Sequence, residues 1–510
     1  MDFSLKKCCR DRLSSLPDEL ICQILSSLPT KDAAIASLSS KKMRSAFMYL
    51  TTLDFEDSPI SYCARKNPQL IERFQIFKTF VDTILSKSRS PHLSKFRLGF
   101  GGDLMIKSFH YHRWSRECGK HCFPDLEPTK LNSWICFPLS RCGVREIDLR
   151  IHVREPEKLP SAFFTYETLE VLKLDTNLDF ELVSSMPSFR LPNLKVLQLR
   201  SVLILEDDFV GRLLSNCPLL KELDMDCWWE YGKSVTISSP LLEKLVLSMN
   251  KNLQFEDPGD LVSIDTPNLQ YFEYEDKLAL HYSVASMKAP VQASINVYCD
   301  SGTADGNFRS IHTLLRAVCN VQRLSLFFSC LERYRKTEPC YCILSVLCDC
   351  VFAIVCMKLL DYEDLENQLP TFHNLKRLEV DTNSSSKWDT VLFVFLMRSP
   401  ILEVLEFREG IDPMYVYVPD HDELIAESER WFYRKNQVSP YCCKPHLKRI
   451  VIKKYRGTIR EVELIRFLLE NAPALEELLI ICKRKDKTIL PESTLKKLPM
   501  ASSTCLIIVQ

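Results

Sequence analysis

The stretch LEVLKL at residues 169–174 decides the fold, because its Leu-x-x-Leu-x-Leu spacing recurs along the chain. The clearest copies begin, at intervals of 25, 26, 22 and 27 residues, at Leu169, Leu194, Leu220, Leu242 and Leu269. Such a period, with leucines alternating along a short strand, is typical of leucine-rich repeats. One repeat cannot bury its apolar side alone, so stacked repeats share a core. The spacing therefore predicts an α/β leucine-rich-repeat solenoid, or horseshoe, an architecture that presents a long binding surface.

Weaker copies extend the repeat from about residue 93 to the end of the chain. They begin at Leu93, Val144, Val321, Leu375, Leu402, Leu447 and Leu475. The intervals from 269 to 321 and from 321 to 375 approach twice the period, and we expect degenerate repeats to fill them. Segments between strands, such as residues 207–214, are expected to form short outer helices.

In each copy the leucines should point inward and the residues between them toward solvent, because side chains alternate along a strand. The outward positions of the central repeats, with two tryptophans just beyond, are the predicted target-binding surface: Lys173, Asp175, Gln198, Arg200, Asp224, Asp226, Trp228 and Trp229. Trp and Arg are frequent binding anchors. For any one of these residues the alternative is an ordinary solvated strand position, and for the tryptophans it is packing against a neighbouring repeat.

Residues 11–50, which precede the repeats, are predicted to form short helices. Pro17 and the acidic pair after it suit a helix N-terminus. One stripe of that helix holds Leu20, Ile21, Ile24, Leu25 and Leu28. Thr30 is expected to cap the next helix. So small a module has little core, and we expect a partner to complete it. The alternative is an ordinary helical cap on the solenoid.

The composition is that of an ordinary folded protein of 510 residues, with 46% hydrophobic and 26% charged residues. Basic and acidic residues balance at 66 each, which argues against a nucleic-acid partner or an acidic membrane surface. The N-terminus lacks a stretch of signal-peptide type. The 22 cysteines are therefore expected to be reduced thiols, several of them inside repeat phrases, in a protein of the cytoplasm or nucleus.

Residues 341–357, YCILSVLCDCVFAIVCM, form an apolar segment at the short end of what a bilayer crossing needs. Asp349 lies at its centre, where a charge is costly in hydrocarbon. We therefore expect an atypical apolar insertion or a buried helix within the repeats, and no membrane span.

Two clusters have metal-ligand residue types, but neither is expected to bind metal. The first, His110, His112, Cys118, His121 and Cys122, lacks a paired Cys-x-x-Cys. The second has an apolar setting that suits buried thiols: Cys340, Cys342, Cys348 and Cys350. The chain also lacks the nucleophile-elbow, phosphate-loop and dinucleotide-binding motifs. We predict no enzyme and no cofactor. A zinc enzyme or a nucleic-acid binder would need the first cluster to hold metal.

Three parts of the chain resemble, in order, the parts of a plant protein family. Residues 11–47 resemble the plant F-box: LPDE at 16–19, IL at 24–25, LPTKDA at 28–33 and KKMR at 41–44 align without a gap. Residues 161–250, with LPNLKVLQL and LLSNCPLLKELDM, are similar to plant F-box leucine-rich repeats. Residues 446–480 resemble the C-terminal FBD domain of the same proteins. The resemblance implies an all-α F-box over 11–55, repeats over 93–430 with an atypical insertion at 341–360, and FBD-like repeats over 431–510.

The resemblance also implies a function, that of a non-catalytic substrate-recognition subunit of a Skp–cullin–F-box ubiquitin ligase. The F-box would dock on a Skp-type adaptor, and through it on a cullin, while the repeats bind an unknown protein target. The residues implied to contact the adaptor, or to support the helix that does, are Leu16, Pro17, Leu20, Ile21, Ile24, Leu25, Leu28, Pro29, Leu38, Met43 and Phe47.

The third F-box segment departs from the family pattern at two positions. An apolar residue is replaced by Ser39 and a large aromatic anchor by Met43. Losing part of an aromatic contact is expected to weaken adaptor binding by roughly five- to thirty-fold, with Phe47 supplying some of the missing area. The alternative function is a leucine-rich-repeat binding module with a decayed F-box that acts outside ubiquitination.

Overall fold

The computed structural model describes most of the helical module and most of the repeat strands. The described residues are 13, 15–57, 69–101, 125–153, 159–176, 178, 190–204, 209–229, 234–251, 261–277, 281–285, 291–299, 312–330, 369–381, 388–408, 410–411, 439–482, 495 and 497–510. The chain divides into two compact units, Met1–Trp228 and Trp229–Gln510. They are called the first and the second unit.

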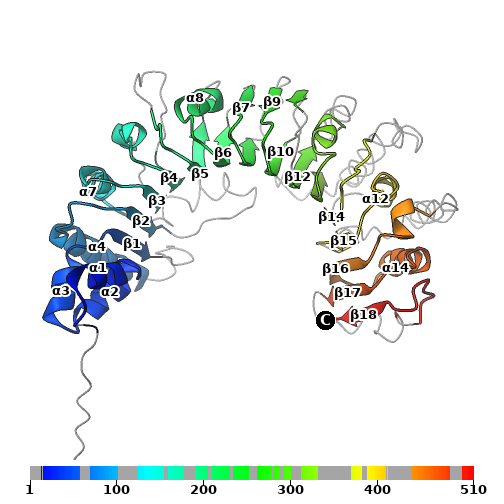
Figure 1. The fold of residues 1–510 in the computed structure, drawn as a ribbon, viewed down its shortest axis with the longest axis horizontal. Coiled ribbons are helices and arrows are strands. Elements are labelled where there is room, and N and C mark those ends of the chain that lie inside the picture. Colours follow the sequence, from blue (N-terminus) through cyan, green and yellow to red (C-terminus); the bar gives the residue numbers. More distant parts are fainter. Residues whose placement is uncertain are drawn as a thin grey trace, which may run out of the picture. The chain divides into compact units, whose positions relative to one another are not determined.

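The first unit begins with a helical module and continues as parallel strands with outer helices (Figure 1). The module consists of α1 (Asp18–Ser26), α2 (Thr30–Ser37) and α3 (Lys41–Phe47). The strands are β1 (Thr52–Asp57), β2 (Lys95–Phe100), β3 (Glu146–Ile151), β4 (Val171–Thr176), β5 (Val196–Ile204) and β6 (Glu222–Trp229). The other helices are α4 (Gln69–Lys87), α7 (Pro128–Cys136), α8 (Phe209–Asn216), and the 3-10 turns η2 (Pro138–Ser140) and η3 (Ser161–Thr165). Helix α8 confirms the outer helix predicted over 207–214.

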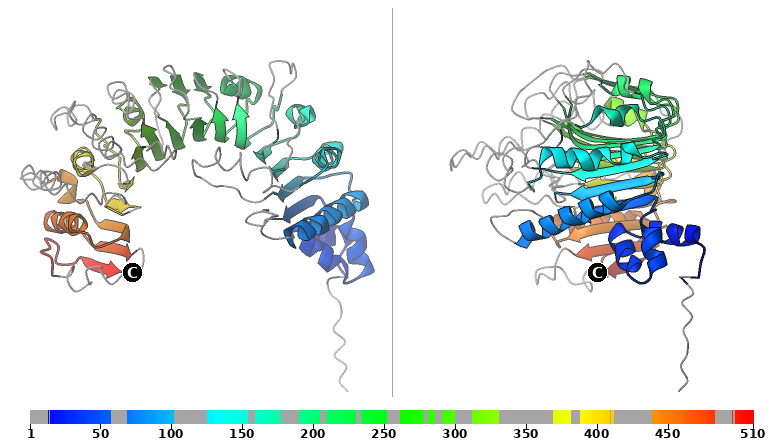
Figure 2. Two further views of the ribbon diagram at one scale, coloured as in Figure 1. Left: turned by 180° about the vertical axis from the view of Figure 1, so that it is seen from behind. Right: turned by 90° about the vertical axis from the view of Figure 1, so that its left-hand side faces the viewer.

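Strands β1 to β6 follow one another in sequence order, and β1 to β5 pair in parallel. Their inward residues form the core predicted from the leucine alternation: Leu172 and Leu174 of β4 are at most 1% exposed, whereas Lys173 between them is partly exposed. Because parallel strands need a crossover connection, the outer helices lie on one side of these strands (Figure 2). Aromatic rings thicken the core where α4 and α7 cover β2, with Phe100 6.1 Å from Trp134 between ring centroids.

Strand β1 was not among the predicted repeats, although Leu50, Leu53 and Phe55 carry the repeat spacing and are buried. It joins the helical module to the repeats. The Thr30 hydroxyl accepts a hydrogen bond from the Asp54 N–H at 2.6 Å, and the Met48 carbonyl accepts one from the Arg89 N–H at 2.8 Å. The prediction that Thr30 caps α2 through its side chain was wrong, because this hydroxyl faces β1 and Pro29 holds the cap position.

The second unit contains parallel strands in the order β8-β10-β12-β13-β14-β15-β16-β17-β18. They are β8 (Lys244–Lys251), β10 (Tyr271–Lys277), β12 (Gln292–Cys299), β13 (Arg323–Cys330), β14 (Arg377–Asp381), β15 (Val404–Phe407), β16 (Arg449–Tyr455), β17 (Glu477–Cys482) and β18 (Leu506–Val509). Its helices are α12 (Trp388–Met397), α14 (Ile459–Asn471) and the 3-10 turn η4 (Tyr441–Cys443). Strand β12 is the degenerate repeat expected between 269 and 321.

A second, smaller sheet forms the outer layer beside β8, β10 and β12, where outer helices were expected. Its strands β7 (Val235–Ser238), β9 (Leu261–Asp265) and β11 (His281–Val284) pair in parallel in the order β11-β9-β7. Short runs such as VTIS and LVSID are rich in β-branched residues, which favour strands over helices. The outer layer is therefore helical or stranded according to its local sequence.

The mixed α/β class, with a long series of parallel strands after N-terminal helices, is as predicted. In the part of the chain that the structure describes, ten cysteines are free thiols, and Cys217 and Cys227 are buried, which raises the pKa of each thiol. Among the same residues, no helix is both long and apolar enough to span a bilayer. The 341–357 segment, the two candidate metal clusters and the interval 331–368 lie outside the described residues.

Candidate functional site

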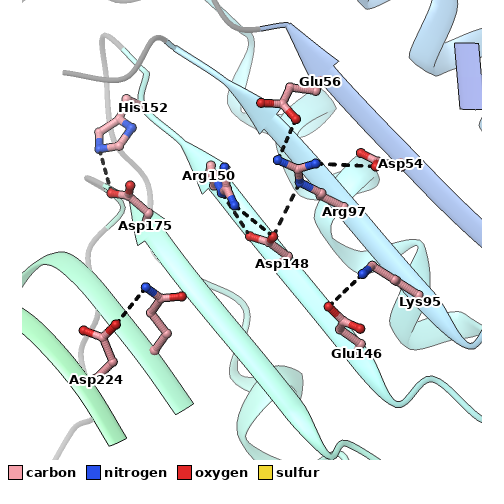
Figure 3. Close-up of polar contacts among 11 residues, drawn as sticks. Asp54, Glu56, Lys95, Arg97, Glu146, Asp148, Arg150, His152, Asp175 and Asp224 are labelled. Atoms are coloured by element: carbon pink, nitrogen blue, oxygen red, sulfur yellow. Dashed lines mark hydrogen bonds and ion pairs between the residues drawn. The ribbon is translucent and has the colours of Figure 1, made fainter. Parts of the chain in front are cut away.

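The strand face opposite the leucines carries a network of charges in the first unit (Figure 3). It is called the polar strand face and consists of the outward positions of β1 to β6. At its centre, Arg97 of β2 reaches carboxylates on both neighbouring strands. Its Nη2 lies 2.6 Å from Glu56 Oε2, and its Nε and Nη1 lie 3.5 Å from Asp148 and Asp54. One guanidinium thus links three strands, because parallel register places outward residues side by side.

Partial burial is the largest influence on the pKa of the Asp54 carboxyl. It raises the pKa of this carboxyl above its ordinary value, although the positive charge of Arg97 acts in the opposite direction. Asp54 Oδ1 is shielded from solvent and has no hydrogen-bond partner. A buried carboxylate without full pairing is costly. At the β1 end of the polar strand face, Asp54 is therefore paired with Arg97 through one oxygen only.

Farther along the face, two aspartates accept bonds from the next strand (Figure 3). Asp224 of β6 accepts from Gln198 at 3.0 Å and pairs with Arg200 at 3.1 Å, both on β5. Asp175 of β4 accepts from the Ser201 hydroxyl at 3.0 Å and lies 3.5 Å from His152 Nε2. These contacts preorganise the surface, since each side chain is held by a neighbour one repeat away.

The structure places all six predicted polar target residues on this face and partly exposes each one: Lys173, Asp175, Gln198, Arg200, Asp224 and Asp226. Trp228 and Trp229 end β6, and their side chains lie outside what the structure describes. Sequence reasoning missed the cluster around Arg97, Asp148 and Arg150. The signal was present, because these residues occupy the same outward positions in the weaker copies that begin at Leu93 and Val144.

A separate apolar surface lies on the helical module. Large side chains of α1, of α2 and of Leu38, which follows α2, are exposed there: Leu20 by 44%, Ile24 by 39%, Ile35 by 60% and Leu38 by 70%. These four residues are called the apolar helix surface. Leu20, Ile24 and Leu38 were predicted to contact a partner, whereas Ile35 was not in that set. Exposed large apolar residues gathered on one small module are typical of an interaction site.

Other predicted contact residues are structural. Ile21, Leu25 and Met43 are at most 5% exposed and form the interior of the three helices. Leu16, Leu28 and Phe47 are half-buried, while Pro17 and Pro29 are exposed at the starts of α1 and α2. The burial of Met43 is consistent with the supporting role in that prediction, and its contact with a partner stays a prediction.

The arrangement offers two surfaces that can bind a macromolecule. Within the described ranges, no group of three His, Cys, Asp or Glu side chains is placed to hold a metal ion. The polar strand face can pair with charged and hydrogen-bonding groups of a macromolecule, and the apolar helix surface can pack against a complementary apolar groove.

A second set of ion pairs lies on the outward face of β14 to β16, in the second unit. The buried Glu406 pairs with Lys453 at 2.6 Å and with Arg377. Burial alone would raise the pKa of Glu406, but the Lys453 hydrogen bond and the charges of Lys453 and Arg377 outweigh it. They hold the pKa below its ordinary value of 4.5. The ionised carboxylate is therefore the form that these cations stabilise.

Glu406→Gln is expected to lower the free energy of unfolding of the second unit by about 1–2 kcal/mol at neutral pH. The pKa of Glu406 is lower in the folded state than in the unfolded state. The stabilisation that its carboxylate provides is therefore complete above the unfolded-state pKa and is lost as the pH falls through the folded-state pKa. The difference between wild type and variant should therefore shrink below pH 4.5. Urea unfolding at neutral and acidic pH measures this difference in stability.

The control is Glu403→Gln, which removes a half-exposed carboxylate 3.9 Å from Lys376. Its stability should differ little from that of the wild type at either pH. A pH-independent loss for Glu406→Gln would contradict the assignment.

Comparisons with known proteins give family models that match three parts of the chain and relatives that match most of it. Family models match for the F-box domain over residues 13–51, for the LRR repeats of FBD-associated F-box protein At5g56370 over 131–294, and for the FBD over 436–480. The chain is 30% identical to F-box/LRR-repeat protein At3g59200 of Arabidopsis thaliana, covering 98% of this chain and 88% of the relative. It is 28% identical to putative F-box/FBD/LRR-repeat protein At3g59240 of the same plant, with coverage of 93% and 84%. Putative F-box protein At1g58310, also from that plant, is 31% identical over 80% of this chain and 75% of its own length.

Proposed function

The chain belongs to the plant F-box/leucine-rich-repeat protein family, and from that premise we propose that it is the substrate-recognition subunit of a Skp–cullin–F-box ubiquitin ligase. Its F-box and leucine-rich repeats imply a substrate-adaptor role. In this proposal the helical module docks on a Skp-type adaptor, which connects it to a cullin, and the repeats hold the target protein. The subunit has no chemistry of its own. Tethering raises the effective concentration of the target near the ubiquitin-transferring partner.

The apolar helix surface is the observation that carries the proposal. Four large aliphatic side chains, Leu20, Ile24, Ile35 and Leu38, remain exposed on a module whose interior is already filled by Ile21, Leu25 and Met43. An apolar surface of this kind is stabilised by burial against a partner. We propose that these four residues contact the adaptor and that the buried residues keep α1 and α2 in position.

The connection between the module and the first repeat supports a mechanical role. The Asp54 N–H of β1 donates to the Thr30 hydroxyl of α2, and the Thr51 N–H, just before β1, donates to the Ser26 hydroxyl of α1 at 3.2 Å. The Arg89 N–H, after α4, donates to the carbonyl of Met48, the residue that follows α3. A subunit that presents a target must hold its adaptor-binding surface and its target-binding surface in a fixed orientation to each other. We propose that these hydrogen bonds fix that orientation at the β1 end of the repeats.

We propose the polar strand face as the target-binding surface, including Lys173, Asp175, Gln198, Arg200, Asp224 and Asp226, with Trp228 and Trp229 beside it. We also propose that the repeats of both units form one horseshoe solenoid, with an F-box over 11–55, repeats over 93–430 and FBD-like repeats over 431–510. Outward residues that are already held by their neighbours lose little conformational entropy on binding, which favours recognition.

The adaptor proposal predicts that the double variant Ile24→Ser, Leu38→Ser binds a purified plant Skp-type adaptor about a hundredfold more weakly than the wild-type chain does. Each side chain would otherwise bury an aliphatic surface at the contact, and two such losses combine to that factor. Calorimetry with the full-length protein measures the change. The matched control is Ile71→Ser, Ile76→Ser on α4, where both isoleucines are more than half exposed and affinity should not change.

Either of two results would contradict the proposal. The first is wild-type binding that the F-box double variant leaves unchanged. The second is an absence of wild-type binding in a chain whose thermal unfolding shows that it is folded. This second result would favour the alternative function, a leucine-rich-repeat binding module with a decayed F-box that acts outside ubiquitination.

A further inference from the structure

The outward face of the second unit has a pocket across β12, β13 and β14; Figure 1 labels β12 and β14. This pocket, of about 200 Å³, is lined by Gln292, Arg323, Leu324, Ser325, Arg377 and Glu379. Parallel register explains the arrangement, since Gln292, Arg323 and Arg377 are aligned across three strands, and Ser325 is aligned with Glu379. The lining is therefore polar, and three side chains with N–H donors stand in one row.

The carboxylates of this region already have partners. Glu379 accepts from the buried Ser325 hydroxyl at 3.0 Å and pairs with Arg377 at 3.0 Å and with Arg408 at 3.8 Å. Glu406 is shared between Arg377 and Lys453. Three cations thus neutralise two carboxylates before Arg323 is considered.

Arg323 and Gln292 are the pocket residues with unused donors. In the part of the chain that the structure describes, the Arg323 guanidinium has no ion-pair partner and the Gln292 amide has no hydrogen bond. Arg323 is exposed at the rim, and Gln292 is half-buried beside it. In this set of contacts Arg377, Arg408 and Lys453 pair with Glu379 and Glu406, and Arg323 adds a further cation that none of these carboxylates engages. The donor set and its charge match an anionic group.

We infer that this pocket binds a carboxylate side chain from an acidic segment of the target protein. The inference rests on the proposed function, because it names the chemistry that one part of the target would present. A planar guanidinium matches a carboxylate through two parallel hydrogen bonds. Arg323 supplies that fork, and Gln292 supplies an N–H donor at its side. The pocket volume suits one acidic side chain, with the main chain of the segment remaining over the strands.

The test uses the full-length protein and fluorescein-labelled hexaglutamate, with hexaglutamine as the neutral probe, followed by fluorescence anisotropy. Hexaglutamate should bind the wild-type chain more tightly than hexaglutamine does. Arg323→Gln should weaken hexaglutamate binding about tenfold, because one charge-assisted pair is lost. Gln292→Ala should weaken it to a smaller extent. The matched control is Arg449→Gln, an outward arginine at the same position of β16 that already pairs with Glu477 at 3.1 Å and lies outside the pocket. Its effect should be less than twofold.

Several outcomes would overturn the inference. Equal losses for Arg323→Gln and Arg449→Gln would mean unspecific attraction to positive charge, and equal binding of both probes would mean that charge is irrelevant. Competition by inorganic phosphate without competition by N-acetylglutamate would mean a phosphate site. Adaptor binding is measured on the same preparations. If it persists while hexaglutamate fails, only the pocket inference is lost. If hexaglutamate binds through Arg323 while the adaptor does not, the proposed ligase function is lost instead.

Discussion

Glu461→Ala is expected to lower the free energy of unfolding of the second unit by about 4 kcal/mol, because this buried carboxylate organises the turn before α14. Its Oε2 accepts three backbone hydrogen bonds, from Arg456 at 3.1 Å, Gly457 at 2.7 Å and Thr458 at 3.0 Å. The Glu461 N–H in turn donates to the Thr458 hydroxyl at 3.3 Å, which completes a capping box. Alanine would leave three N–H groups without their acceptor in an interior where Glu461 is 0% exposed.

Urea unfolding followed by circular dichroism measures this loss, and hydrogen exchange over residues 449–482 locates it. Glu470→Ala is the matched control, since Glu470 is an exposed glutamate on the same helix. Its removal should change stability by less than about 0.5 kcal/mol. A loss below about 1 kcal/mol for Glu461→Ala would show that water or a neighbouring group can replace the carboxylate at this turn.

Trp134→Ala is expected to destabilise the first unit by about 3–5 kcal/mol, the range for removing a large aromatic side chain from a core. Trp134 of α7 is 1% exposed and packs edge-on against Phe77 and Phe100, with centroid distances of 6.4 and 6.1 Å. Its Nε1 also donates to Asp82 Oδ1 at 2.8 Å. The substitution therefore creates a cavity between α4, α7 and β2 and removes a hydrogen bond from Asp82.

Differential scanning calorimetry of the full-length protein measures the effect on the first unit. Trp134→Phe should cost less than Trp134→Ala, because it keeps most of the ring packing and loses the indole donor. Asn132→Ala changes an exposed residue on the same helix and should be close to neutral. If Trp134→Phe were as damaging as Trp134→Ala, the hydrogen bond to Asp82 rather than the packing would dominate.

The repeat strands were largely predictable because alternation is a local property. Leu169, Leu172 and Leu174 are all at most 1% exposed, as the spacing requires for one face of a strand. Strand β1 was missed although Leu50, Leu53 and Phe55 fit the same pattern, because that stretch was assigned to the helical module. Strand β12 was expected only as a degenerate copy, since Ala293 and Ile295 replace the leucines there.

Some residues of the candidate sites were predictable from the sequence and others were not. Outward positions such as Lys173 and Asp224 could be named from the strand period alone. The separation of the helical module into buried Ile21, Leu25 and Met43 and exposed Leu20, Ile24, Ile35 and Leu38 could not, because it depends on how three short helices pack together. A single stripe of apolar residues identifies an amphipathic helix, but it does not say which residues face the other helices and which face a partner.

The sequence by itself determined which side chains enter the core and which face outward along each strand, because backbone geometry fixes that alternation within a few residues. Only the tertiary structure decided which outward charges neutralise one another. Arg97 joins Asp54, Glu56 and Asp148 on neighbouring strands, while Arg323 keeps a free guanidinium among the described residues. The physical reason is distance: ion pairing falls off within a few ångströms, and partners one repeat or more apart in sequence meet only when the strands are stacked in register.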